Sequence, residues 1–303
     1  MKSAAIESGT VLEESEVSRH GGVADFVELI KARLTLLVLL TTAVGYYLGA
    51  PASFSPLALF HAVFGTALAA AGAAALNQWW ERKVDALMHR TKMRPIPAGR
   101  MSARDALVVG SFLALIGVGY LAITTNLLSA ALAAATIVIY IFGYTPLKRI
   151  STTNTLVGAV PGALPPMIGW AAARGDIGWP AWSLFAILFC WQMPHFYAIG
   201  WMYREDYARA GFQMLSSRDI DGARSSRQSV FFATLLIVAS IFPALQRVTG
   251  PVSFGGELFL GALFLAVAVR FWRRRTAREA RTMFIASIIY LPLALAVLVI
   301  TKL

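Results

Sequence analysis

The chain has 303 residues, of which 57% are hydrophobic and only 14% are charged, and its mean hydropathy is +0.64. A soluble globular domain carries about 45–50% apolar and about 25% charged residues, so this composition excludes a soluble fold and predicts a polytopic membrane protein. The single cysteine, Cys190, excludes an internal disulfide. The net charge of +11 raises the question of nucleic-acid binding, which the placement of the cations answers below.

The first 30 residues are polar and contain six of the sixteen acidic side chains. They lack the apolar core of a cleaved signal peptide. We therefore predict a cytoplasmic N-terminal tail over residues 1–30 that ends in a short interfacial helix near Val23–Ile30. Residues 31–303 are predicted to form one membrane domain.

Apolar stretches recur through the rest of the chain, and a membrane-spanning helix needs about 20 such residues. They predict an all-α protein with nine transmembrane helices. In the fifth stretch the prolines of Pro161–Pro166 predict a break at membrane depth, which needs a protein-lined or water-lined surrounding. The predicted spans are 34–50, 57–78, 106–124, 127–143, 154–173, 180–200, 229–246, 256–272 and 283–300.

Nine spans place the connecting loops alternately on the two sides of the membrane. Of the 27 lysines and arginines, all but Arg174, Arg247 and Lys302 then fall on the side of the N-terminus. Cationic loops face the cytoplasm, so the N-terminus is predicted to be cytoplasmic and the C-terminus to lie on the opposite side. The positive charge therefore lines a membrane face and does not indicate a nucleic-acid surface.

Polar side chains that could bind a metal follow the second span. Asn77, Glu81 and Asp85 are spaced four residues apart, which places three oxygen donors on one helix face over about 12 Å. Mg²⁺ prefers such carboxylates together with waters and substrate phosphates. Cations follow at once, so the loop indicates a metal-bridged diphosphate site. The alternative is a solvated loop with ordinary ion pairs. The cations are Arg82, Lys83, Arg90, Lys92 and Arg94, with His89 among them.

Two further cytoplasmic segments carry polar residues. Gln192 and His195 lie within or at the edge of the sixth span, where polar groups are costly and usually face an interior cavity. A packing role is the alternative for His195. Between the fourth and fifth spans, Lys148 and Arg149 are either phosphate ligands or only determinants of orientation.

These motifs resemble those of a known protein family. Asn77-x₃-Glu81-x₃-Asp85 followed by Arg90-Thr-x₂-Arg94-Pro-x-Pro97 is similar to the first Asp-rich motif of the UbiA-type intramembrane prenyltransferases. The resemblance extends from about residue 30 to the C-terminus and is closest to the members that farnesylate heme. Glu81 replaces the usual aspartate, and the second motif is poorer in aspartate than elsewhere in the superfamily. The other matching segments are Tyr144–Arg149, Pro161–Trp170, Trp191–Ala198 and Glu205–Gly211.

The resemblance implies a helical bundle around a central cavity and Mg²⁺-dependent transfer of a farnesyl group. The donor would be farnesyl diphosphate and the acceptor a vinyl group of heme B, giving heme O and diphosphate. It also implies a bacterial inner membrane, a cytoplasmic active site, no nucleic-acid partner and a downstream heme A-forming enzyme. The implied metal ligands are Asn77, Glu81 and Asp85, and the implied diphosphate ligands are Arg90, Lys92, Arg94, Lys148 and Arg149. Contacts on the heme side or in the second motif are expected from His195, Glu205, Asp206 and Arg209. Tyr144 or Tyr197 is expected to stabilise the allylic cation.

Two other functions remain open from the sequence. Prenylation of an aromatic ring in quinone biosynthesis would use the same donor, and an assay with heme B against 4-hydroxybenzoate separates the two. A transporter for an anionic metabolite would show inverted repeats and charges near the membrane midplane. The ionisable residues instead cluster at one face, and no convincing repeat is present.

Overall fold

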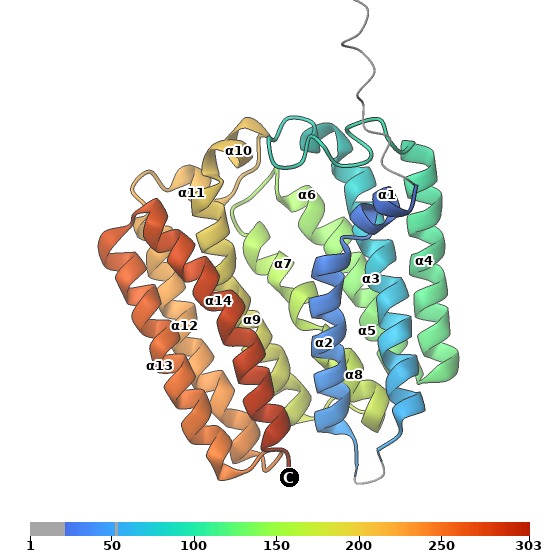
Figure 1. Cartoon of the computed structure of the whole chain (residues 1–303), viewed down its shortest axis with the longest axis vertical. Coiled ribbons are helices and arrows are strands. Elements are labelled where there is room, and N and C mark those ends of the chain that lie inside the picture. The colour runs from blue at the N-terminus through green and yellow to red at the C-terminus, as the bar shows by residue number, and fades with distance from the viewer. Residues whose placement is uncertain (1–21, 52–53) are drawn as a thin grey trace, which may run out of the picture.

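The computed structural model describes residues 22–51 and 54–303, and its regular elements are helices throughout these ranges. Figure 1 shows them as one bundle of long, roughly parallel rods with short helices at one end. This confirms the predicted all-α membrane fold. Eight spans are long and apolar enough to cross a membrane: α2 (Ala32–Gly49), α3 (Pro56–Asp85), α4 (Ala103–Thr124), Leu127–Leu147, Asn154–Arg174, α12 (Ala223–Leu245), α13 (Pro251–Arg274) and α14 (Ala277–Ile300).

A ninth long helix, α9 (Trp179–Met202), packs along α12 and α14 inside the bundle. It contains no Asp, Glu, Lys or Arg. Its Trp, Pro, Gln, His and Tyr side chains make it less apolar than the eight spans above. Together with the eight spans, α9 accounts for the nine helices that the sequence predicts within the described residues. Several helices are longer than the predicted apolar spans, because polar residues extend them. For example, α3 continues past residue 78 to Asp85.

Two of the spans are not continuous α-helices. Leu127–Leu147 consists of α5 (Leu127–Val138), the π-helix η1 (Ile139–Tyr144) and the single turn α6 (Thr145–Leu147). Asn154–Arg174 consists of α7 (Asn154–Ala163) and α8 (Pro165–Arg174), which confirms the predicted break. The buried Gln192 side chain donates to the Ala159 carbonyl at 2.7 Å, so a polar side chain from α9 supports the irregular backbone.

Side-chain caps and small residues fix where the helices begin and how closely they pack. The hydroxyl of Ser55 accepts from the backbone N–H of Ala58 at the start of α3, next to a proline in the first helical turn. A Cβ at Gly72 of α3 would overlap the backbone of Ala114, and one at Gly117 of α4 would overlap that of Ala69. The backbones of α3 and α4 are therefore in direct contact, as small residues permit in membrane bundles.

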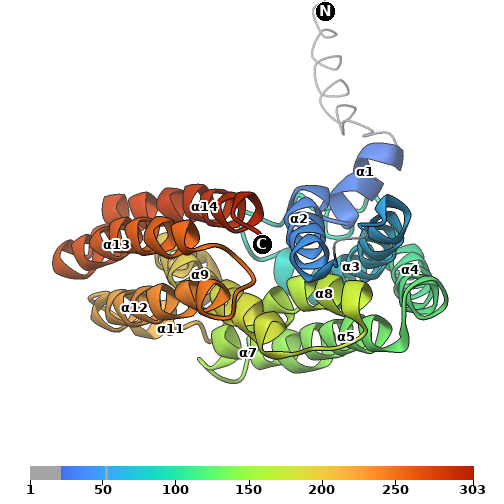
Figure 2. The same ribbon diagram turned by 90° about the horizontal axis from the view of Figure 1, so that it is seen from below.

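Figure 2 shows that the helices form two groups. One group contains α2–α8, and the other contains α9 and α12–α14; α7 and α8 pack on α9 and join them. At the C-terminal end, the Lys302 ammonium donates to the carbonyls of Tyr47 and Ala50 at 2.6 and 2.8 Å, which ties α14 to α2. The predicted central cavity remains a prediction.

The predicted site loops lie at the opposite end from the C-terminus, beside α10 (Arg204–Arg209) and α11 (Leu215–Arg218) (Figure 1). The short helix α1 (Gly22–Leu29) is also at this end, where an interfacial helix was expected. Arg100 pairs with Asp25 and Glu28 of α1 at 2.8 and 2.7 Å, so this part of the predicted tail packs on the body. Residues 1–21 of the tail lie outside the described residues.

Candidate active site

The three predicted metal ligands lie on the last turns of α3 and are almost completely buried. The exposed fractions are 1% for Asn77, 5% for Glu81 and 1% for Asp85. Their spacing of four residues places them on one face of α3, as predicted. Each of them contacts a basic side chain from a different segment of the chain, as the following distances show.

Asn77 is held from two sides. Its amide oxygen accepts from the Lys31 ammonium at 2.7 Å, and its amide nitrogen donates to the Thr145 hydroxyl at 3.1 Å. The Thr145 hydroxyl in turn donates to the carbonyl of Tyr140, in the π-helix η1. These bonds turn the oxygen of Asn77 toward the cationic side of the cluster. Single π-helical turns are frequent at functional sites, and here one brings Tyr140 and Thr145 to the end of α3.

Lys31 occupies the break between α1 and α2. Its φ of 50° is left-handed, a conformation that costs a non-glycine residue about 1 kcal/mol or more. Its ammonium also lies 3.4 Å from the Tyr140 hydroxyl. Burial, followed by the nearby charge of Arg94, lowers the pKa of Lys31 to about 7. A strained residue that inserts a buried amine among polar groups is typical of a binding site.

Glu81 pairs with Lys148, whose ammonium lies 2.7 Å from a carboxylate oxygen. Burial opposes the charge of Lys148, but the carboxylate of Glu81 outweighs it and raises the pKa of Lys148 above its usual range. The ammonium also lies 4.4 Å from the centre of the Tyr144 ring, so the face of this ring already receives a cation. Lys148 is therefore a fixed positive charge next to Glu81.

Asp85 pairs with Arg94, whose guanidinium donates to one carboxylate oxygen at 2.7 Å. The other oxygen, Oδ1, is buried and has no hydrogen-bond partner among the described residues. A buried carboxylate oxygen without a partner is costly. Together with the oxygens of Glu81 and Asn77, this free oxygen makes the donor set fit a small hard cation such as Mg²⁺.

The cluster as a whole carries an excess of positive charge. Two carboxylates, Glu81 and Asp85, face three cations, Lys31, Lys148 and Arg94. A surplus of cations in a buried site stabilises a bound anion. A diphosphate brought in with its metal ion supplies that anion and gives each cation an oxygen to bind.

The two loops that the sequence singled out contact each other. The carboxylate of Asp206 in α10 accepts from the backbone N–H groups of His89 and Arg90 at 3.4 and 3.3 Å, and it pairs with Arg209 at 2.7 Å. Partial burial opposes ionisation, but these donors lower the pKa of Asp206. The Arg90 guanidinium donates to the Tyr207 hydroxyl at 3.3 Å. The loop after α3 is therefore clamped to α10.

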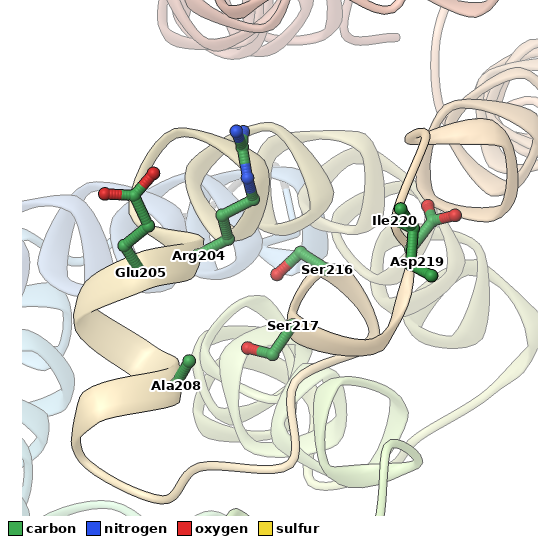
Figure 3. Close-up of a pocket in the computed structure, with 7 residues that line it drawn as sticks. All are labelled: Arg204, Glu205, Ala208, Ser216, Ser217, Asp219 and Ile220. Carbon is green, nitrogen blue, oxygen red and sulfur yellow. The ribbon is translucent and has the colours of Figure 1, made fainter.

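Four predicted site residues are not brought to this cluster. Lys92 and Arg149 are exposed, and their side chains make no hydrogen bond or ion pair with the described residues. Tyr197 is buried in the core against Phe232 of α12. Glu205 points away from the loop and lines a separate pocket of about 220 Å³ between α10 and α11, together with Arg204, Ser216 and Ser217 (Figure 3).

His195 lies within α9 and makes no hydrogen bond or ring contact with the cluster among the described residues. It is seven residues from the end of α9, about 10 Å, whereas Glu81 is four residues from the end of α3, about 6 Å. Its partly buried ring stacks between Trp191 and Phe284, with ring centres 5.5 and 5.1 Å away. Its Nδ1 lies 2.7 Å from the hydroxyl of Ser287 in α14.

Sequence reasoning missed several residues of the cluster. In the sequence Lys31 counts only as one of the cations on the N-terminal side, and Tyr140 falls inside the fourth predicted span. Thr145 lies in the matching segment Tyr144–Arg149 but has no predicted role. The available signal was position: a lone lysine directly before the first span, and a Tyr-x₃-Tyr-Thr-Pro segment directly before Lys148. These residues lie 46 to 109 positions from their partners in the chain, so no local pattern connects them.

Comparison with known proteins identifies the family of the chain. The UbiA prenyltransferase family model matches residues 38–289. The chain is 46% identical over 287 residues to the protoheme IX farnesyltransferase of Solibacter usitatus, covering 92% of this chain and 98% of the relative. It is 43% identical over 288 residues to the protein of the same name from Koribacter versatilis, covering 92% and 93% of the two chains.

Solved structures share the fold. A digeranylgeranylglyceryl phosphate synthase superposes with a TM-score of 0.78 at 14% identity, covering 92% of this chain and 98% of that one. A UbiA homologue from Archaeoglobus fulgidus bound to DMAPP and Mg²⁺ superposes with a TM-score of 0.65 at 15% identity, covering 90% and 99%. The chain therefore belongs to the UbiA prenyltransferase family and is an integral membrane prenyltransferase.

Proposed function

We propose that this prenyltransferase transfers the farnesyl group of farnesyl diphosphate to a vinyl group of heme B, giving heme O and diphosphate. The observation that carries the donor half is the buried cluster at the end of α3, where two carboxylates and an amide meet three cations. The acceptor half is supported by the relatives called protoheme IX farnesyltransferase, which match nearly the whole chain.

The cations of the cluster bind the diphosphate. In this proposal Lys31, Lys148 and Arg94 exchange their present partners for phosphate oxygens, and Arg90 reaches the same group from the clamped loop. Charge-assisted bonds from fixed donors are strongest where negative charge develops. These side chains therefore stabilise the leaving diphosphate more than the intact ester, which is the condition for catalysis. Lys92 and Arg149, being exposed, serve at most to attract the anionic substrate.

Asn77, Glu81 and Asp85 would hold Mg²⁺, and the free Oδ1 of Asp85 is the donor already available. When bound, this ion supplies Lewis-acid stabilisation of the leaving group. The A. fulgidus homologue bound to Mg²⁺ supports the use of a divalent cation in this fold. The number of ions depends on whether Asp206, now occupied by the loop after α3, also contributes.

Departure of diphosphate with the electrons of the C–O bond leaves an allylic cation. The Tyr144 ring face, 4.4 Å from the Lys148 ammonium, is placed to stabilise that cation by about 0.5–2 kcal/mol. The vinyl group of heme then attacks the cation with its electron pair. Water adds to the new cationic carbon and loses a proton, which leaves the hydroxyl of heme O. The surrounding helices keep bulk water from the first cation.

We assign the acceptor side to His195, which lies about 10 Å along α9 from the end of that helix. A heme beneath the diphosphate site would place a vinyl carbon near the breaking bond. The proposal therefore assigns His195 to heme binding, and it gives Asp206 and Arg209 the role of holding the cytoplasmic loops together. Heme and the farnesyl chain are both apolar, so a site within the membrane lets each enter from the bilayer.

We also propose that the site faces the cytoplasm of a bacterial cell, with the C-terminus on the other side of the inner membrane. Of the lysines and arginines in residues 22–51 and 54–303, all but Arg174, Arg247 and Lys302 lie at the end of the bundle that holds the cluster, which supports this orientation.

Mass spectrometry of heme tests the proposal. Purified protein incubated with farnesyl diphosphate, heme B and Mg²⁺ should yield heme O, and EDTA should abolish the product. Asp85→Asn should abolish it as well, whereas Asp105→Asn, at an exposed cytoplasmic position, should not. Unmodified heme together with prenylation of 4-hydroxybenzoate would contradict the proposal and support the aromatic alternative.

A further inference from the structure

Ser287 is a point at which α9 docks on α14. Its side chain is fully buried, and it accepts the indole N–H of Trp191 on its backbone carbonyl at 2.8 Å. Its hydroxyl lies 2.7 Å from Nδ1 of His195. Two residues one turn apart on α9 are thus held by one residue of α14, the first through its backbone and the second through its side chain.

The hydrogen bonds of Ser287 determine which nitrogen of His195 carries the proton. A serine hydroxyl has one proton, and that of Ser287 is donated to the carbonyl of Phe284 at 2.6 Å. This arrangement favours the hydroxyl as an acceptor toward His195, with the ring proton on Nδ1. In the neutral ring Nε2 then holds a free lone pair.

The surroundings favour that neutral ring. No carboxylate lies within ion-pair distance of His195 among the described residues, and its ring is stacked between Trp191 and Phe284. Nε2 makes no hydrogen bond within the described part of the chain, and it is not among the enclosed polar atoms. The structure therefore presents an oriented imidazole whose accessible nitrogen is an acceptor.

We infer that Ser287 is a positioning residue that sets His195 as a ligand to the iron of the heme acceptor. This inference rests on the proposed function and decides between two roles for the histidine. A bond to a heme propionate would need a donor at Nε2, which this tautomer lacks. Iron needs the lone pair that it offers, and a hydrogen bond at the other nitrogen is the usual support for a metal-bound histidine.

Binding of heme analogues tests the inference. Wild-type protein, His195→Ala, Ser287→Ala and Ser229→Ala would each be titrated with ferric heme B, its dimethyl ester and iron-free protoporphyrin IX. Ser229 is the matched control, because its buried hydroxyl bonds only to the carbonyl of Ser225 in its own helix. Binding of a non-hydrolysable farnesyl diphosphate analogue with Mg²⁺ reports that each variant is folded.

We expect a histidine-ligated heme spectrum for wild type and Ser229→Ala, and loss of it in His195→Ala. Ser287→Ala should weaken heme affinity by about 10–100-fold, the usual effect of removing such a supporting bond. The affinity loss in His195→Ala should persist with the dimethyl ester and disappear with protoporphyrin IX.

The reverse analogue pattern, loss with protoporphyrin IX but not with the ester, would overturn iron ligation in favour of a propionate contact. Heme affinity and spectrum of Ser287→Ala equal to those of Ser229→Ala would overturn the role of Ser287. If wild type failed to bind any heme, the proposed function itself would fall. If wild type made heme O while His195→Ala kept the wild-type spectrum, only this inference would fall.

Discussion

Individual side chains at the end of α3 act in pairs. Each predicted metal ligand has a basic partner at 2.7 Å: Asn77 with Lys31, Glu81 with Lys148, and Asp85 with Arg94. Buried charges are costly unless they are paired, so the basic partners offset the cost of burying the two carboxylates. The same cations then have phosphate oxygens to bind. Removal of one cation should therefore affect both the resting site and the transition state.

Lys148 offers the cleanest test at this scale. Lys148→Gln removes the charge next to Glu81 and should lower kcat by about 10²–10³-fold, as loss of a fixed transition-state donor does. Arg149→Gln removes the adjacent but exposed charge and should change kcat by less than about threefold. Single-turnover formation of heme O measures both. Equal losses in the two variants would show that Lys148 acts only through overall charge.

How far the sequence predicts such pairs depends on their separation in the chain. Arg94 is nine residues from Asp85, so both belong to one local motif, although that motif assigned Arg94 to the diphosphate and did not predict the ion pair. Lys31 is 46 residues from Asn77 and Lys148 is 67 residues from Glu81. The motif indicated Lys148 through the family resemblance, whereas nothing local marked Lys31. Contacts of this kind are created by helix packing and appear only in the structure.

Among the elements, α3 matters most because it carries the cluster, and α4 holds it in place. The contact between them depends on small residues, since a Cβ at Gly117 would overlap the backbone of Ala69. The sequence predicted both spans from their apolar content. It could not tell which glycines lie in the contact, because α4 has several.

Substitution of those glycines separates them. Gly117→Ala should force α3 and α4 apart and destabilise the protein by about 1–3 kcal/mol. Gly119→Ala, two residues along the same helix, meets no atom within 4 Å and should leave stability unchanged or raise it by up to about 1 kcal/mol. Thermal unfolding in detergent measures the difference. Equal melting temperatures for the two variants would refute the close α3–α4 contact.

The loop after α3 and helix α10 form a second functional contact, which Asp206 holds through the backbone of His89 and Arg90. Asp206→Ala should free these N–H groups and increase hydrogen exchange over residues 86–100. Glu205→Ala, the neighbouring acid that makes no such bond, should leave exchange in this loop unchanged. An increase of the same size in both variants would mean that the clamp does not depend on Asp206.

At the scale of the whole molecule, the sequence predicted nine spans and a charged end, and the structure places the cluster at that end (Figure 1). The lengths of the apolar stretches and the distribution of the cations are properties of the sequence, so the spans and the charged end could both be predicted from it. The division into two groups, α2–α8 on one side and α9 with α12–α14 on the other, could not be predicted, because it depends on which helices pack together. Nor could the π-helix η1, whose residues have ordinary helical composition.

Labelling of introduced cysteines tests the membrane orientation. The protein's single cysteine, Cys190, is buried and should not react with the label. In intact cells a membrane-impermeant maleimide should label Arg174→Cys from outside. Lys92→Cys should react only after the membrane is opened, because its loop lies at the cationic end. Labelling of Lys92→Cys in sealed cells would reverse the proposed orientation.

The proposed mechanism depends most on the binding of a divalent cation by Asn77, Glu81 and Asp85. Calorimetric titration with a non-hydrolysable farnesyl diphosphate analogue tests this binding most directly. Wild type and Asp105→Asn should bind the analogue with Mg²⁺ and lose this binding with EDTA, while Glu81→Gln and Asp85→Asn should bind it at least about tenfold more weakly. Wild-type affinity and unchanged Mg²⁺ dependence in both Glu81→Gln and Asp85→Asn would contradict the account.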